Sequence, residues 1–427
     1  MKDISSTFYH STLQQKQDES KKEINLQVFI FLGLIVSTGI DITPYFNFHL
    51  GSLQVSLPDL FLCLLIYGLI ADMAVGKQKF SVFSLHMSRL IFFAGIISLI
   101  NLLYVGGGRF IMYDVKISLK LFEHAILILV AGSTISEQSS LKRSLKVLCF
   151  VSLILSMLTI LQSLGIFHIG EGFTRRTTLQ MGPFLIGTIA GAENVIGISF
   201  LILAAFPLMT SRFVFNSLPV RSLFVSITIL AVIITFTRSL WVSLIVEIVL
   251  LISFYITQFK SLLLKCILLV LLAVAIIFFI QNIDTLYSLL VDLRSSTVTG
   301  RTQGYLSSLS LVFSNPIYIL FGAGKGHFLQ MQFYTGKSAL AHNFLIDLFV
   351  SKGIIVLLIV ITFMVSLITK LILTKAPDNS DLVNIGIIAT IGIFFCSMFT
   401  PSVNSIQFWL FMALMSSMVS ILNTETK

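Results

Sequence analysis

The sequence predicts an all-α, polytopic membrane protein, a bundle of about 12 transmembrane helices with one long extracytoplasmic loop. Three observations support this. Apolar residues make up 56% of the chain and charged residues only 11%, whereas soluble domains are close to a quarter charged. The chain contains 38 Phe. Hydrophobic stretches near the roughly 20 residues needed to cross a bilayer recur from end to end.

The predicted spans are separated by Pro, Gly and polar residues, as expected where helices leave the bilayer. A polar stretch of about two dozen residues precedes the first span, so we expect no cleavable signal peptide. The four Cys lie inside apolar stretches without metal-ligand spacing, and we expect them to be small core residues. The twelve spans are approximately 25–40, 58–75, 89–105, 117–133, 145–166, 185–209, 222–236, 240–256, 262–280, 344–369, 382–399 and 404–422.

The Lys and Arg in the short loops predict the orientation. With a cytoplasmic N-terminus, most of the 28 Lys and Arg fall on the inner side, loop after loop. The net charge of +9 is therefore a topology signal, and we expect no nucleic-acid partner. The chain then divides into a cytoplasmic tail 1–24, helices over 25–280, an extracytoplasmic loop 281–343, helices over 344–422, and a cytoplasmic tail 423–427.

Several basic residues depart from this preference for the cytoplasmic side. The predicted outer face carries Arg109, Arg175, Arg176, Arg238, Arg294, Arg301 and His342. For Arg109 and Arg294, snorkelling or pairing with lipid headgroups is an equal explanation. Loop 281–343 is far longer than usual connections, which favours a functional role.

Within that loop we expect two short helices near the membrane. Tyr305, Leu309 and Val312 recur at helical spacing after Gly300-Arg301, and Asn315-Pro316 ends the run. We expect Arg301 at the start of this helix, where the positive helix N-terminus suits phosphate. The alternative is an amphipathic helix that only covers the bundle.

A glycine-rich turn follows, Phe321-Gly322-Ala323-Gly324-Lys325-Gly326. Gly322 and Gly324 allow close backbone approach to a substrate, and we predict that they contact the diphosphate or glycan. It is not a nucleotide P-loop, because no Ser or Thr follows Lys325. A plain turn is the alternative.

Arg238 lies between two apolar spans, where an unpaired arginine costs several kcal/mol. One explanation is a structural ion pair with Glu247 or Glu193. The other is an anion site at the outer mouth of the bundle.

Together these residues resemble the O-antigen ligase and O-antigen polymerase superfamily. Phe321-Gly322-Ala323-Gly324 is similar to the family's Leu-Gly-x-Gly turn, His342-Asn343 to its His-Asn pair, and Gly353-Ile354 to the Gly-Leu/Ile element that follows. The stretch Thr237-Arg238-Ser239-Leu240 resembles its Ser-Arg-Gly-Ala. A weaker match runs from Gly187 to Asn194, after Arg175-Arg176. The resemblance covers residues 175–370. Departures are Tyr305 for Trp, Lys325 for Pro and Glu193 for Pro, which leave the acceptor open.

The resemblance implies a fold like that of glycosyltransferase C enzymes. It also implies glycan transfer from undecaprenyl diphosphate to an acceptor sugar, on the outer face of the cytoplasmic membrane and without metal or cofactor. Arginines suit the diphosphate leaving group, and a histidine suits the general base. We therefore predict His342 as the base, Arg238 and Arg301 as diphosphate ligands, and Arg175, Arg176 and Asn343 as substrate-binding residues. For His342, the alternative is an interfacial histidine with a satisfied hydrogen bond.

The implied partners are an undecaprenyl-diphosphate-linked oligosaccharide, an acceptor glycan or glycolipid, and membrane lipids. Two accessory proteins are also implied, a chain-length regulator and a flippase. Two reactions remain open. A polymerase would join repeat units, whereas a ligase would attach finished glycan to lipid A-core. The departures near the acceptor side favour the polymerase slightly. From another class, a lipid-linked oligosaccharide flippase or transporter would use intramembrane carboxylates, for which Asp72, Glu193, Glu247 and Asp347 are candidates.

Overall fold

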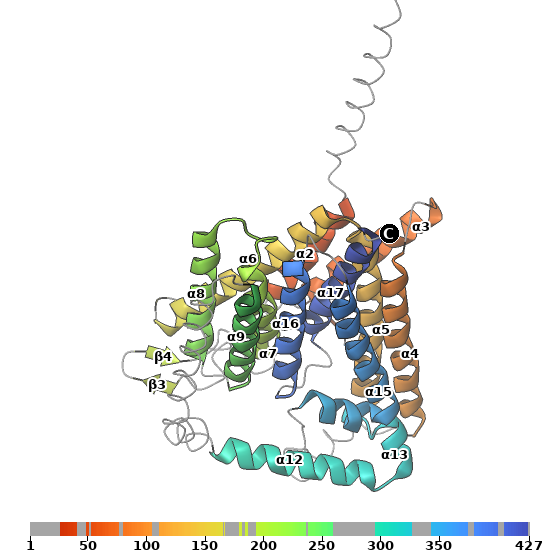
Figure 1. The fold of residues 1–427 in the computed structure, drawn as a ribbon. Coiled ribbons are helices and arrows are strands. Elements are labelled where there is room, and N and C mark those ends of the chain that lie inside the picture. The colour runs from red at the N-terminus through yellow and green to blue at the C-terminus, as the bar shows by residue number, and fades with distance from the viewer. Residues whose placement is uncertain are drawn as a thin grey trace, which may run out of the picture.

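The computed structural model is a bundle of long α-helices (Figure 1). It describes residues 26–40, 48–50, 53–76, 80–104, 111–164, 166, 179–181, 184–186, 194–235, 238–258, 295–326, 343–374, 380–399 and 405–425. The helices are α2 (Leu26–Ile40), α3 (Leu57–Ala74), α4 (Val82–Tyr104), α5 (Ile111–Thr134), α6 (Gln138–Ser163), α7 (Asn194–Thr210), α8 (Leu218–Thr235), α9 (Arg238–Gln258), α12 (Ser295–Phe313), α13 (Pro316–Phe321), α15 (Phe344–Leu373), α16 (Ser380–Ser397) and α17 (Ile406–Glu425).

These helices confirm the predicted all-α membrane bundle. Helices α2 to α9 and α15 to α17 each coincide with a predicted span, and the remaining prediction, 262–280, lies outside the described residues. Among the described residues, eight helices are long and apolar enough to cross a membrane, and two shorter apolar helices lie at 26–39 and 199–210. The chain is thus a multi-pass membrane protein.

Two short antiparallel hairpins were not predicted. Strand β1 (Phe48–Leu50) pairs with β2 (Leu53–Val55), and β3 (Leu179–Met181) pairs with β4 (Phe184–Ile186). The predicted start of the sixth span at 185 is therefore wrong, because α7 begins only at Asn194. An apolar run alone does not distinguish a short strand from the first turn of a buried helix.

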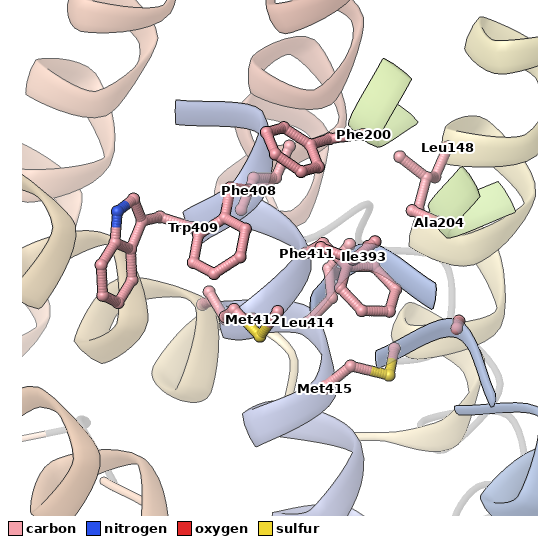
Figure 2. Packing of buried hydrophobic residues seen from close by; sticks show 14 of the residues in the cluster. Leu148, Phe200, Ala204, Ile393, Phe408, Trp409, Phe411, Met412, Leu414 and Met415 are labelled. Carbon is pink, nitrogen blue, oxygen red and sulfur yellow. The ribbon is translucent and has the colours of Figure 1, made fainter. Parts of the chain in front are cut away.

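Helix α17 lies at the centre of the bundle and is the most buried of the eight candidate spans. The ring of Phe408 lies 5.5 Å from that of Phe200 between centroids, with Trp409 beside it (Figure 2). Phe408 also lies 5.5 Å from Phe344, and Trp409 stacks on His124 at 5.1 Å. Close packing of this kind matters in a bilayer, because lipid is as apolar as the side chains and dispersion contacts must favour helix association.

Hydrogen bonds show which helix ends lie together at each of the two ends of the bundle. At one end, Ser84 in the first turn of α4 bonds Ser420 in the last part of α17, and Ser211, directly after α7, donates to Asp381. At the other end, Gln407 donates to Thr38 O. Helices α12 and α13 lie across this second end, opposite the C-terminus (Figure 1). The alternation predicted from Lys and Arg also groups these helix ends, and which end faces outward stays a prediction.

Candidate functional site

Helix α13 leads directly into the glycine-rich turn, at the second end of the bundle (Figure 1). Asn315 caps this helix, with its side-chain oxygen accepting from Ile317 N at 2.9 Å and Pro316 in the first position. The helix stops at Gly322, whose φ of 83° is in the left-handed region that favours glycine. The predicted helix break at Asn315-Pro316 is confirmed.

The turn fits into a break in α15. Gly353 has φ 82° and ψ 175°, so α15 consists of two helical segments that meet there. A Cβ on Gly353 would lie 2.2 Å from Leu320 O, and one on Gly322 would lie 2.5 Å from Lys352 N. Ala323 N donates to Val350 O at 2.8 Å, a carbonyl at this break. Because residues 322 and 353 are glycines, the backbone of the turn can contact the backbone of α15.

Asn101 of α4 holds the turn and the break together. Its Nδ2 donates to Phe321 O at 2.7 Å, Ser351 O at 3.0 Å and Gly322 O at 3.1 Å. All three acceptors are carbonyl oxygens, which fixes the orientation of the amide. Chain segments from three parts of the sequence are thereby joined by one buried side chain.

Asp114 of α5 binds the next two residues of the turn. Its Oδ1 accepts from Lys325 N at 2.6 Å and from Gly326 N at 3.0 Å, and its Oδ2 also accepts from Gly326 N at 3.0 Å. Asp114 is buried. Successive backbone N–H groups are a common anion site, and here the anion is a carboxylate of the same chain.

Two lysines complete this polar cluster. Lys325 Nζ lies 3.3 Å from Asp347 Oδ2 in the first turn of α15, and both side chains are largely buried. Buried Lys352 donates from Nζ to Ser118 Oγ at 2.8 Å. With Asp114, two positive and two negative groups lie together, which offsets part of the cost of removing each charge from water.

Asn343 begins α15. Its Oδ1 accepts from Leu345 N at 2.9 Å and Ile346 N at 3.1 Å, and its Nδ2 donates to Met398 O at 2.7 Å beyond the end of α16. Both polar atoms of the side chain therefore have partners within the protein. Asn343 is therefore a helix cap, and its predicted contact with the substrate stays a prediction.

The remaining predicted site residues are described only in part. His342, Arg175 and Arg176 lie outside the described residues. Arg238 is the first residue of α9, and Arg301 lies within α12, but both side chains are outside what the structure describes. The expected position of Arg301 at a helix start is wrong. Helix α12 begins at Ser295, before Gly300, so Arg301 lies beyond the N-terminal turn.

The suggested ion pair between Arg238 and Glu247 also fails. The two residues are nine apart in one helix, about 13.5 Å along its axis, too far for an ion pair. Glu247 is fully buried, and neither carboxylate oxygen has a hydrogen-bond partner among the described residues. Its carboxyl lies against Gly392 of α16, where an added Cβ would be 1.8 Å from Oε1. Glu193 lies outside the described residues.

The glycines of the turn approach the chain itself. Gly322 packs on α15, and a Cβ on Gly324 would be 2.9 Å from Asp114 Oδ2. Their predicted contact with a diphosphate stays a prediction. Asn101 and Asp114 were not predicted, although polar residues at the ends of apolar spans are a signal for them.

The comparisons with known proteins fit this arrangement. Residues 223–361 match the protein-family model described as O-Antigen ligase. The match runs from α8 through α9, α12 and α13 to the break in α15, and so includes the turn and its glycine partner. No curated protein sequence matches the chain. The match supports the resemblance of residues 223–361 to the O-antigen ligase and polymerase superfamily that the motifs predict.

Proposed function

We propose that this membrane enzyme moves a glycan from undecaprenyl diphosphate to an acceptor sugar on the outer face of the cytoplasmic membrane. The observation that carries the proposal is the family match over residues 223–361, which covers the glycine-rich turn and the break in α15 against which it packs. The end of the bundle with α12 and α13 would face outward, and both termini would be cytoplasmic. The division of the chain at 25, 281, 344 and 423 is part of this proposal.

The proposed role of each residue follows from the charge that develops on the substrates during transfer. As the glycosidic bond to the carrier breaks, the diphosphate gains negative charge, which Arg238 and Arg301 neutralise, with Arg175 or Arg176 contributing. His342 accepts the proton of the attacking hydroxyl. Asn343, as the cap of α15, fixes the backbone directly after His342. The reaction as proposed uses no metal or cofactor.

Polymerisation of repeat units is the proposed reaction, in O-antigen, capsule or exopolysaccharide synthesis. Ligation of finished glycan to lipid A-core is the second candidate, favoured by the description of the matching family model. Lipid extracts of a deletion strain separate them. Single-repeat glycan indicates a polymerase, and carrier-bound long polymer indicates a ligase. A chain-length regulator and a flippase would be partners of the first reaction.

The direct test uses purified protein with lipid-linked glycan and acceptor, without a membrane gradient. Turnover supports an enzyme, whereas no turnover together with gradient-dependent movement of the lipid would favour the flippase alternative. His342→Ala and Arg238→Ala should each lower turnover by about 100-fold or more. Matched controls are His86→Ala and Arg89→Ala. Both residues are exposed and lie near the start of α4, at the end of the bundle away from α12 and α13. Wild-type turnover in well-expressed His342→Ala and Arg238→Ala would contradict the assignment.

A further inference from the structure

Asp114 has no role in the proposed chemistry, yet its carboxylate is fully engaged with the outer segment. It lies in the first turn of α5, whereas its partners, the N–H groups of Lys325 and Gly326, are more than 200 residues later in the chain. Because a carboxylate accepts stronger hydrogen bonds than a neutral group, this contact ties α5 to the turn more strongly than a neutral acceptor would.

The glycine-rich turn also packs against α12. Val312 of α12, Ala323 of the turn and Val350 of α15 form a small buried apolar cluster. Position 312 lies eleven residues from Arg301 in the same helix, about 16 Å along a rigid rod. A shift of the turn therefore moves the helix that carries Arg301.

We infer that Asp114 is a positioning residue for the transfer reaction, because its carboxylate holds the turn 322–326 on the bundle and thereby sets where α12 and Arg301 lie. The inference rests on the proposed function for its catalytic part. The contact itself does not depend on that function.

The experiment compares Asp114→Asn and Asp114→Ala with wild type in the purified full-length protein. The asparagine keeps one acceptor oxygen, and the alanine keeps none. Asp381→Asn and Asp381→Ala are matched controls, since Asp381 Oδ2 accepts from Ser211 Oγ at 3.1 Å and Arg212 N at 3.2 Å at the opposite end of the bundle. Amide hydrogen exchange, melting temperature, kcat and KM are measured for all five proteins.

Three results are expected. Amide exchange of residues 322–326 accelerates in Asp114→Ala and less in Asp114→Asn. The kcat falls by about 10- to 100-fold in Asp114→Ala, with an intermediate value in Asp114→Asn and KM within about threefold of wild type, because misplacement by about 1 Å has effects of this size. The Asp381 variants lose a comparable amount of melting temperature but keep the wild-type kcat.

Each alternative outcome has a distinct meaning. Unchanged exchange of residues 322–326 in Asp114→Ala overturns the contact. Faster exchange with an unchanged kcat overturns the positioning role. An equal fall in kcat in the Asp381 variants also overturns it, because general destabilisation would then explain the loss. A wild-type protein that exchanges as expected but transfers no glycan refutes the proposed function and the positioning role together, while the contact stands.

Discussion

At the scale of single residues, four described glycines have positive φ, and two of them make a controlled comparison. Gly353 has φ 82° and is enclosed, whereas Gly76 has φ 70° with nothing within 4 Å of its missing Cβ. In Gly76→Ala, only the backbone conformation is unfavourable. In Gly353→Ala, a clash with Leu320 O is added.

We therefore predict that Gly76→Ala lowers the free energy of unfolding by about 1 kcal/mol and Gly353→Ala by about 3 kcal/mol or more. Thermal unfolding in detergent measures both. Gly353→Ala should also loosen the turn, seen as faster amide exchange at Ala323, which donates to Val350 O. Equal losses for the two variants would show that the turn does not pack against the break in α15.

Glu247 is predicted to be a destabilising residue. Within the described residues its two oxygens have no hydrogen-bond partner, and a buried charge without a partner is unfavourable. Glu247→Gln should raise the free energy of unfolding by about 1 kcal/mol or leave it unchanged. Glu123→Gln is the control and should lower it, because Glu123 Oε2 lies 2.5 Å from Lys120 Nζ. A loss in Glu247→Gln as large as in Glu123→Gln would reveal a partner for Glu247.

Some residues of the candidate site could be predicted from the sequence, and others could not. The motif glycines, Asn343 and the family could be recognised from residue order alone. The partners of the turn could not, because Asn101 and Asp114 belong to no local motif and acquire their role only when distant spans meet. The helix start before Arg301 was missed because Ser and Thr between 295 and 299 have no apolar period.

At the scale of elements, α15 and the turn are joined by the Lys325–Asp347 ion pair. A double-mutant cycle with Lys325→Ala and Asp347→Ala should give a coupling free energy of about 1 to 3 kcal/mol, because both side chains are largely buried. The pair Lys120–Asp59, with side chains 25% and 23% exposed, is the comparison and should couple less.

Chemical denaturation of the four proteins in each cycle provides the measurement. A coupling free energy for Lys325–Asp347 that is no larger than for Lys120–Asp59 would show that the turn is not held to α15 by charge. Salt dependence offers a second readout, since screening should weaken the more exposed pair more.

Elements were the most predictable level of the fold. A helix long enough to approach the bilayer thickness leaves a hydrophobic signal of many residues, and every predicted span in the described parts has its helix. The strands β1 to β4 have three residues each, too short to leave such a signal. The break in α15 was also not predicted, because Ser351-Lys352-Gly353 interrupts the apolar run for only three residues.

At the scale of the whole molecule, the two ends of the bundle can be tested for orientation. Ser136, between α5 and α6, and Ser314, between α12 and α13, are exposed at opposite ends. In a variant without the four native Cys, a single cysteine at 314 should react with a membrane-impermeant maleimide in intact cells. A cysteine at 136 should react only after permeabilisation. The reverse labelling would invert the proposed topology, and labelling of both in intact cells would contradict the alternation.

The contacts of Asn101 and Asp114 also impose an order on the protein's synthesis. Asn101 precedes Phe321 by 220 residues, and Asp114 precedes Lys325 by 211. At about 5 to 20 residues per second, the ribosome needs roughly 10 to 40 s to make the intervening chain. During that interval the side chains of Asn101 and Asp114 lack the backbone partners that the turn supplies later. The end of the bundle that carries α12 and α13 is therefore completed late, and a chain truncated before residue 322 should be a substrate for membrane quality control.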